Sequence, residues 1–145
     1  MQLALDAARD AARQGEVPVG AVLLSAEGEV LACAGNRRQR DQDPTAHAEM
    51  VVLREAAAKL GGWRLTGTTM VVTLEPCLMC AGALVLARVA RVVYGAKDPK
   101  GGAVESLYRV VEDARLNHQV EVIGGVLAEE AGALLRAFFQ ERRRS

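Results

Sequence analysis

Residues 17–24 are apolar almost without interruption, and such a run is typical of a β-strand that is covered on both of its faces. Before this run, apolar residues recur at helical spacing over residues 3–12 and stop at Gly15. After it, the Glu27-Gly28 pair is expected to turn the chain into a second strand at residues 30–34, which makes a hairpin. A covered strand next to a helix predicts a layered α/β domain.

Helical and strand-like periods alternate along the rest of the chain. Further strands are expected at residues 69–74, 91–94 and 120–123. A helix capped by Thr45 and stopped by Gly61 is expected at residues 45–60, and others at residues 77–88, 104–111 and 128–143, of which 104–111 has the weakest pattern. No internal repeat, linker or low-complexity tract separates these elements. Residues 1–145 are therefore expected to form one domain.

The charged side chains balance, with 18 basic and 18 acidic residues. Binding of a nucleic acid would therefore have to rest on local basic groups rather than on the overall charge. Charges also recur through residues 1–14, so this segment is expected to be neither a signal peptide nor a membrane span. The three cysteines are an odd number without the spacing of a disulfide framework, which favours a reducing compartment. These features predict a cytoplasmic protein that does not bind membranes.

Two short motifs contain the residues that predict chemistry. His47 and Glu49 lie in Pro44-Thr-Ala-His-Ala-Glu, and Cys77 and Cys80 lie in Glu75-Pro-Cys-Leu-Met-Cys. The two cysteines are three positions apart at an expected helix start, so both sulfur atoms face one side of the first turn. Free backbone N–H groups and the helix dipole favour the thiolate form there. One imidazole and two thiolates form a ligand set that suits zinc.

The number of ligands distinguishes a structural zinc site from a catalytic one. Structural sites have four protein ligands, whereas a site with three leaves a position for water and lowers the pKa of that water to roughly 7. The only other histidine and cysteine are His118, expected in a loop, and Cys33, expected in the core. Glu49 lies about 200° further round a helix than His47, so it is placed to move protons rather than to bind the metal.

Each motif alone has an ordinary explanation. H-x-E lies more often on a helix surface than in a site, and C-x-x-C can be a redox pair or two buried thiols. H-x-E together with P-C-x-x-C, each at a helix start, is far more specific and is the signature of zinc-dependent nucleobase deaminases. A zinc-stabilised binding module without activity is the alternative from another class. It would need a fourth protein ligand and would have no need of Glu49.

At these residues the sequence resembles the bacterial tRNA-specific adenosine deaminases of the cytidine-deaminase-like superfamily. The resemblance extends over nearly the whole chain. It includes Glu16-Val-Pro-Val-Gly-Ala-Val, Gly35-Asn-Arg, Asp43-Pro-Thr-Ala-His-Ala-Glu, Thr73-Leu-Glu-Pro-Cys-Leu-Met-Cys-Ala-Gly-Ala, Arg91-Val-Val-Tyr-Gly-Ala-Lys-Asp and Asn117-His. The zinc motif marks the superfamily, whereas the Gly-Ala-Lys-Asp loop and the basic C-terminal helix point to the tRNA branch.

The resemblance implies a three-layer αβα fold with a mixed five-stranded sheet, and a homodimer. It implies hydrolytic deamination of adenosine to inosine at the anticodon wobble position of tRNA, with the anticodon stem-loop as partner. It makes His47, Cys77 and Cys80 the zinc ligands and Glu49 the proton carrier. It also places substrate contacts at Val17, Pro18, Asn36, Ala48, Asp98, Lys100 and Arg142.

The main alternative is a deaminase of a free base or nucleoside, such as guanine or cytosine, with the same metal ligands. Pocket shape rather than the ligand set decides the substrate, so the sequence separates the two poorly. Local basic groups favour RNA, and solvated surface clusters are their ordinary explanation. These groups are Arg37, Arg38, Arg40, Lys97, Lys100 and Arg142 to Arg144.

Overall fold

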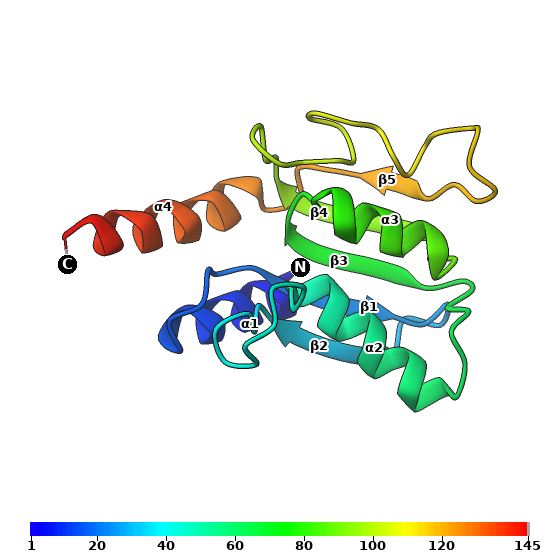
Figure 1. The fold of residues 1–145 in the computed structure, drawn as a ribbon, viewed down its shortest axis with the longest axis horizontal. Coiled ribbons are helices and arrows are strands. Elements are labelled where there is room, and N and C mark those ends of the chain that lie inside the picture. The colour runs from blue at the N-terminus through cyan, green and yellow to red at the C-terminus, as the bar shows by residue number, and fades with distance from the viewer. Residues whose placement is uncertain (145) are drawn as a thin grey trace.

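A five-stranded sheet with the strand order β2-β1-β3-β4-β5 lies at the centre of the fold (Figure 1). The structure is a computed structural model and describes residues 1–144. The strands are β1 (Gly20–Leu24), β2 (Val30–Gly35), β3 (Thr69–Leu74), β4 (Arg91–Ala96) and β5 (Glu121–Ile123). β1 runs antiparallel to both β2 and β3, whereas β3, β4 and β5 run parallel to one another. The expected mixed five-stranded sheet is confirmed.

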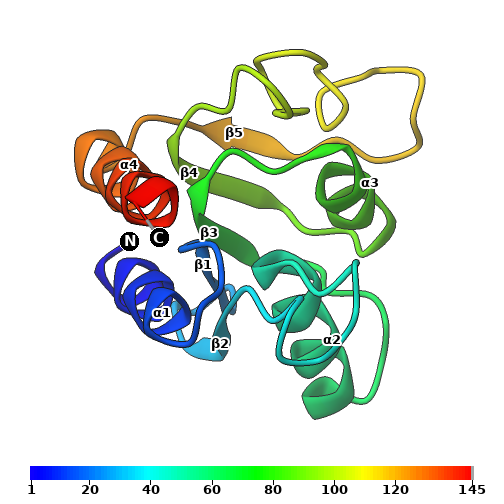
Figure 2. The same ribbon diagram turned by 60° about the vertical axis from the view of Figure 1, so that its left-hand side comes forward.

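Two helices cover each face of the sheet, which confirms the three-layer αβα arrangement (Figure 2). On one face lie α1 (Gln2–Arg13) and α4 (Ala128–Arg144), and on the other α2 (Ala48–Leu60) and α3 (Leu78–Leu86). The paired residues Leu23 and Met70 belong to the larger core beneath α2 and α3, while the next pair, Val22 and Val71, packs with Ala4 of α1. Strand β1 is apolar on both faces because both are covered.

The chain turns before it enters β1, so the strand expected at residues 17–24 begins only at Gly20. The N–H of Val19 donates to the carbonyl oxygen of Val17 at 2.8 Å, and Pro18 between them has no N–H to offer a neighbouring strand. Gly20 lies so close to α1 that a Cβ would stand 1.9 Å from the carbonyl oxygen of Ala4. Residues 17–19 are thus left at the end of the sheet.

The helix expected at residues 104–111 is absent, and the segment between β4 and β5 is a loop made of turns. The N–H groups of Val104, Glu105 and Ser106 donate to the carboxylate of Glu75. The N–H groups of Leu107 and Val110 donate to the carbonyl oxygens of Gly102 and Ala103, which lie five and seven residues earlier and not four as in an α-helix. The apolar spacing of residues 104–111 suggested a helix, but Val104 and Val111 are fully buried because they anchor the loop to the core.

Helix α2 begins three residues later than expected, with His47 at its N-cap in place of Thr45. The Thr45 hydroxyl donates instead to the Asp43 carboxylate at 2.7 Å. The first helical N–H, that of Ala48, donates at 2.9 Å to the side-chain oxygen of Asn36. A cap contributed by a distant loop therefore fixes the start of α2 and leaves the imidazole of His47 outside the helix proper.

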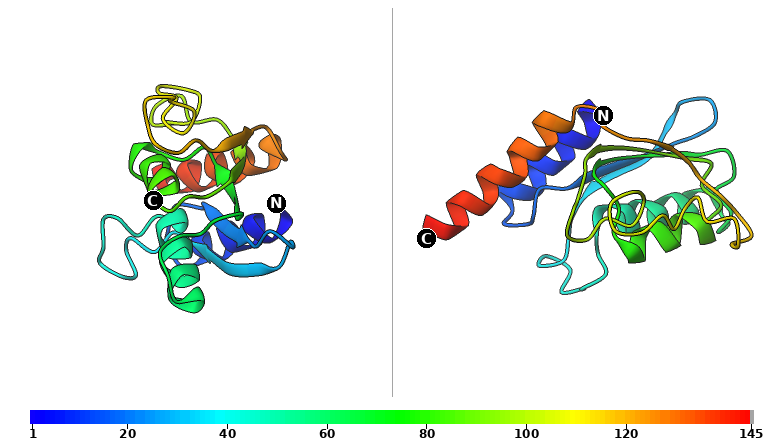
Figure 3. Two further views of the ribbon diagram at one scale, coloured as in Figure 1. Left: turned by 90° about the vertical axis from the view of Figure 1, so that its right-hand side faces the viewer. Right: turned by 90° about the horizontal axis from the view of Figure 1, so that it is seen from above.

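The remaining helices and strands lie where the sequence predicts them, with ends that differ by one or two residues. Figure 3 shows that α4 runs alongside α1 and extends beyond the sheet. Within residues 1–144, no helix is long and apolar enough to cross a membrane.

Candidate metal centre

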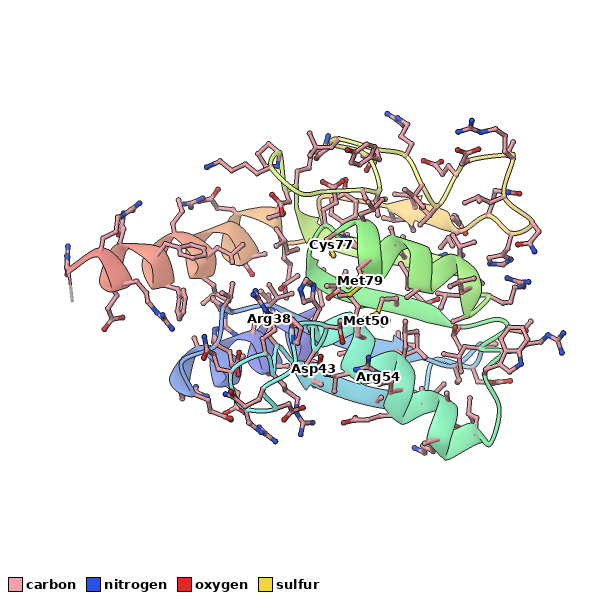
Figure 4. The ribbon with its side chains drawn as sticks, viewed as in Figure 1. Arg38, Asp43, Met50, Arg54, Cys77 and Met79 are labelled. Carbon is pink, nitrogen blue, oxygen red and sulfur yellow. The ribbon has the colours of Figure 1, made fainter. Side chains whose placement is uncertain are left out.

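The three expected zinc ligands converge where α2 and α3 begin. His47 is the N-cap residue of α2, Cys77 is the N-cap residue of α3, and Cys80 lies in the first turn of α3. Figure 4 shows Cys77 at the start of α3, above the loop that carries Arg38. Strand β3 brings Cys77 to this point, because only Glu75 and Pro76 separate Cys77 from the end of the strand.

The distances between the three donor atoms fit one tetrahedral zinc ion. The Nδ1 atom of His47 lies 3.5 Å from the sulfur of Cys77 and 3.7 Å from that of Cys80, and all three donors lie within 4.8 Å of one another. Zinc bonds of about 2.0–2.1 Å to nitrogen and about 2.3 Å to sulfur at tetrahedral angles require about 3.6 Å between those atoms. The residues therefore fit the metal that the sequence predicts.

The electrostatics of the centre favour a thiolate. The pKa of Cys77 is lowered to about 3, chiefly because the Cys80 thiol donates a hydrogen bond to it, with His47 and the backbone N–H of Cys80 adding to the effect. The pKa of Cys80 is raised by its bond to Cys77 and by burial. Cys77 thus loses its proton readily, whereas Cys80 loses its proton only when a cation binds the sulfur.

Within residues 1–144, no fourth histidine, cysteine or carboxylate joins the three donors. His118 is bonded to the carbonyl oxygen of Val89 at 2.7 Å, in the loop where it was expected. Cys33 was expected in the core, but it is exposed on β2, which is an edge strand of the sheet. A group of three donors is the number that leaves a position for water in catalytic zinc sites.

Glu49 is buried in the first turn of α2, with 4% of its surface exposed. Burial disfavours the charged carboxylate and raises its pKa to about 7, and the charge of Cys77 adds to this shift. A cavity of about 150 Å³ lies beside the centre. It is lined by Val17, Val19, Asn36, Arg38, His47, Glu49, Leu74, Glu75, Cys77 and Asp98. A carboxyl group with a pKa near 7 in such a cavity can both accept and donate a proton near neutral pH.

Asn36 joins two walls of the cavity. Its side-chain nitrogen donates to the carbonyl oxygen of Val17 at 3.1 Å, and its side-chain oxygen accepts from the N–H of Ala48 at 2.9 Å. Pro18 and Ala48 do not line the cavity themselves, although the residues on either side of each do. The backbone segments around both expected substrate contacts are therefore at the cavity.

The other expected substrate contacts divide between the cavity and the surface. Asp98 lines the cavity, and Lys100 is exposed two residues further along the same loop, where its N–H donates to Asp98 at 3.1 Å. Arg142 lies elsewhere, at the end of α4. Its guanidinium donates to the carbonyl oxygen of Gly15 at 2.7 Å and stands 4.8 Å from the centre of the Phe138 ring.

Sequence reasoning missed Val19, Arg38, Leu74 and Glu75 as residues that line the cavity. Leu74 and Glu75 directly precede the Pro-Cys-x-x-Cys motif, so their position next to a ligand is a signal that the sequence contains. Arg38 gives no such signal, because its loop is rich in other charged residues.

Comparisons with known proteins place the chain in a family. The family model of the cytidine and deoxycytidylate deaminase zinc-binding region matches residues 1–96. A tRNA-specific adenosine deaminase of Bacillus subtilis is 54% identical over 144 residues, which cover 99% of this chain and 89% of that protein. The chain belongs to the tRNA-specific adenosine deaminase family. Another tRNA-specific adenosine deaminase, from Agrobacterium fabrum, is 49% identical, with 99% and 93% of the two chains covered.

Solved structures share the fold of this tRNA-specific adenosine deaminase family member. One, from work on A-to-I editing by tRNA:A34 deaminases at the wobble position of transfer RNA, has a TM-score of 0.90 and 48% identity, with 93% of this chain and 97% of that chain covered. A guanine deaminase from Nitrosomonas europaea has a TM-score of 0.82 at 25% identity, covering 94% and 81%. The matching zinc-binding region and the three convergent donors together confirm zinc as the metal.

Replacing one ligand tests the centre. We expect Cys77→Ser to lose most of its zinc, because a hydroxyl is a far poorer ligand than a thiolate. The measurement is zinc content per chain after gel filtration, with Cys33→Ser as the matched control that keeps one zinc. Full zinc occupancy in both Cys77→Ser and Cys80→Ser would contradict the assignment.

Proposed function

We propose that this chain catalyses the hydrolytic deamination of adenosine to inosine at the anticodon wobble position of tRNA. The observation that carries the proposal is a buried glutamate, Glu49, which lines one cavity with His47 and Cys77, two of the three zinc donors. The tRNA-specific adenosine deaminases that are 42–54% identical over nearly the whole chain support the choice of substrate. The reaction adds water at C6 of the base and releases ammonia.

Zinc bound by His47, Cys77 and Cys80 would act as a Lewis acid that makes water acidic near neutral pH. We propose that Glu49 moves the protons. Its carboxylate accepts a proton from the attacking water and delivers it to N1 of the adenine ring. It then carries the second proton to the amino group at C6, so that the C6–N bond breaks and ammonia leaves. The pKa of about 7 suits both directions of transfer.

The base has to leave the RNA stack to reach this cavity. We propose that Val17, Pro18, Asn36 and Ala48 hold it there. The Asn36 amide supports this role, because it ties the backbone of Val17 to the start of α2 and its nitrogen has a second hydrogen to donate. Walls that are bonded to each other hold their positions before substrate arrives, which lowers the entropic cost of orienting the base.

Glu49→Gln tests the proton carrier. The substitution keeps the size of the side chain but removes the group that accepts a proton. We expect turnover to fall by roughly 10²- to 10⁴-fold, while zinc content and melting temperature stay unchanged. The matched control is Glu55→Gln, on the exposed side of the same helix. Near-normal turnover in Glu49→Gln would show that another group carries the proton.

We propose that Asp98, Lys100 and Arg142 contact the anticodon stem-loop around the flipped base. Asp98 reaches the cavity, and the exposed Lys100 lies two residues beyond it on the same loop. Arg142 donates a hydrogen bond to the carbonyl oxygen of Gly15 near the contact of α1 and α4, so its guanidinium is oriented before RNA binds. Because the formal net charge is zero, such local groups have to supply the attraction to phosphates.

An assay with several substrates tests this choice. We expect ammonia release from an adenosine-containing anticodon stem-loop and little from free adenosine or guanine, since a loop base is splayed out at modest cost. Arg142→Ala should weaken stem-loop binding and reduce the salt slope by about one phosphate contact. The matched control on the same helix is Arg136→Ala, whose guanidinium pairs with Glu129. Efficient turnover of free guanine or cytosine, without turnover of the stem-loop, would favour the free-base alternative instead.

We further propose that the protein is a homodimer joined through the outer surface of α2 and α3. An apolar groove of about 270 Å³ lies there, and Arg54 is the only charged residue among those that line it. Its side chains include Trp63 and Leu86, which are 54% and 70% exposed. A second copy is the occupant that fits best, because an isologous interface places the same patch on both subunits and an apolar patch is complementary to itself.

Leu86→Asp tests this interface. A carboxylate on each copy would be buried opposite apolar side chains, so we expect a monomer in analytical ultracentrifugation at a concentration where the unmodified protein sediments as a dimer. Leu116→Asp is the matched control, because Leu116 is also exposed but lies outside the groove. A dimer that persists in Leu86→Asp would contradict the proposed surface.

We also propose that the chain acts as a single domain in the cytoplasm. Both halves of the sequence contribute strands to one sheet, and the proposed substrate, tRNA, is a cytoplasmic molecule in bacteria. A single cooperative unfolding transition and recovery with the cytoplasmic fraction are the observations that these two proposals require.

A further inference from the structure

Glu75 is the most heavily bonded side chain near the centre, and the proposed reaction does not use it. It follows β3 directly, and only 2% of its surface is exposed. One carboxylate oxygen accepts the N–H of Asp98 at 3.0 Å and the hydroxyl of Ser106. The other accepts the N–H groups of Val104 at 3.2 Å, Glu105 at 2.8 Å and Ser106 at 2.8 Å. The carboxylate thus gathers both ends of the segment 98–106.

These bonds fill the accepting capacity of the carboxylate. A carboxylate has about four lone-pair sites, and five donors converge on this one. Burial by itself would raise the pKa of Glu75, but the hydrogen bonds from Ser106, Glu105 and Asp98 outweigh it and lower the pKa. Glu75 is therefore a fixed anion, in contrast to Glu49, whose pKa is raised.

The segment 98–106 is also fitted against Glu75 and against the turn that carries a zinc ligand. A Cβ on Gly102 would stand 2.3–2.5 Å from the Glu75 carboxylate, so only glycine fits there. Gly102 forms an antiparallel bridge with Cys77, and the N–H of Ala103 donates to the carbonyl oxygen of Pro76 at 2.9 Å. One wall of the cavity is thereby fastened to the metal-binding turn.

We propose that Glu75 is a positioning residue, which holds the segment 98–106 as a preformed wall of the cavity and so sets the affinity for the RNA substrate. Within this segment, Asp98 is the residue that lines the cavity itself. A wall ordered in advance spares the substrate the entropic cost of ordering it. The inference rests on the proposed function for its substrate, but the order of the wall is a property of the chain alone.

Amide hydrogen exchange of the zinc-loaded protein tests the order of the segment 98–106 and does not depend on enzymatic activity. In Glu75→Gln the side-chain NH₂ faces backbone N–H donors, so we expect the amides of Asp98, Val104, Glu105 and Ser106 to exchange at least about tenfold faster, while those of β3 and β4 keep their protection. The matched control is Glu112→Gln, an exposed acid in the same inter-strand loop. Unchanged exchange at the four amides would overturn the proposal.

Steady-state kinetics with the anticodon stem-loop separate positioning from chemistry. For Glu75→Gln we expect KM to rise roughly tenfold or more, with kcat changing less than about threefold and zinc content unchanged. A fall in kcat at unchanged KM, or loss of zinc, would overturn the positioning role. If the unmodified protein fails to deaminate the stem-loop, the proposed function fails, and the exchange experiment still decides whether Glu75 orders the wall.

A second variant covers the case in which Glu75→Gln does not fold. Gly102→Ala leaves the carboxylate intact but pushes a methyl group against it, so we expect the same faster exchange and the same rise in KM. Gly62→Ala is the matched control, since a Cβ there meets nothing within 4 Å. Normal exchange and normal KM in Gly102→Ala would overturn the proposal.

Discussion

The meeting of two helix starts at the imidazole of His47 is the interaction on which the rest of the site depends. The N-termini of α2 and α3 point their positive dipole ends toward the same place, where two sulfur atoms lie 3.5 and 3.7 Å from Nδ1. Such ends repel one another unless negative charge lies between them. The thiolate of Cys77 supplies that charge, and together with His47 and Cys80 it would hold a zinc ion there. Zinc held by these donors would therefore stabilise the packing of the two helices, as in other proteins whose zinc affinity is part of their folding energy.

The buried carboxyl groups around the cavity differ in their surroundings and in the direction of their pKa shifts. Glu49 has an apolar setting that raises its pKa, and Glu75 has a shell of donors that lowers it. A third buried acid, Glu16, also holds a loop: it is 3% exposed and accepts the N–H groups of Gln39 and Arg40, in the loop before α2. The loops on both sides of the cavity are therefore held by buried carboxylates, while Glu49, which we propose as the proton carrier, has a different setting. Environments that push pKa values apart are the usual way in which one residue type serves two roles.

The sequence predicted the parts of this protein that depend on local pattern. Strand β3 and the two motif-bearing helices follow from apolar periodicity, and the ligand set follows from residue type and spacing. Long-range bonds decided what was missed. The helix expected at 104–111 is absent because its N–H groups pair outside the helical pattern, that of Glu105 with Glu75, 30 positions earlier in the chain, and that of Val110 with Ala103. The cap of α2 comes from Asn36 and not from Thr45 for the same kind of reason. The RNA contacts of Arg142 and Lys100 stay predictions, since side chains at the surface are recognised only by what they bind.

The boundary of the family match has a consequence for how substrate choice can change. The zinc-binding region ends at residue 96, the last residue of β4, and includes every metal donor together with Glu49. The wall that contains Asp98 starts immediately afterwards. Substitutions after Ala96 can thus reshape what the cavity admits without moving a ligand, provided that the carboxylate of Glu75 still finds its donors. Exchanging the segment after Ala96 as a unit would therefore change one wall of the cavity, while the metal donors and Glu49 keep their places in the sequence.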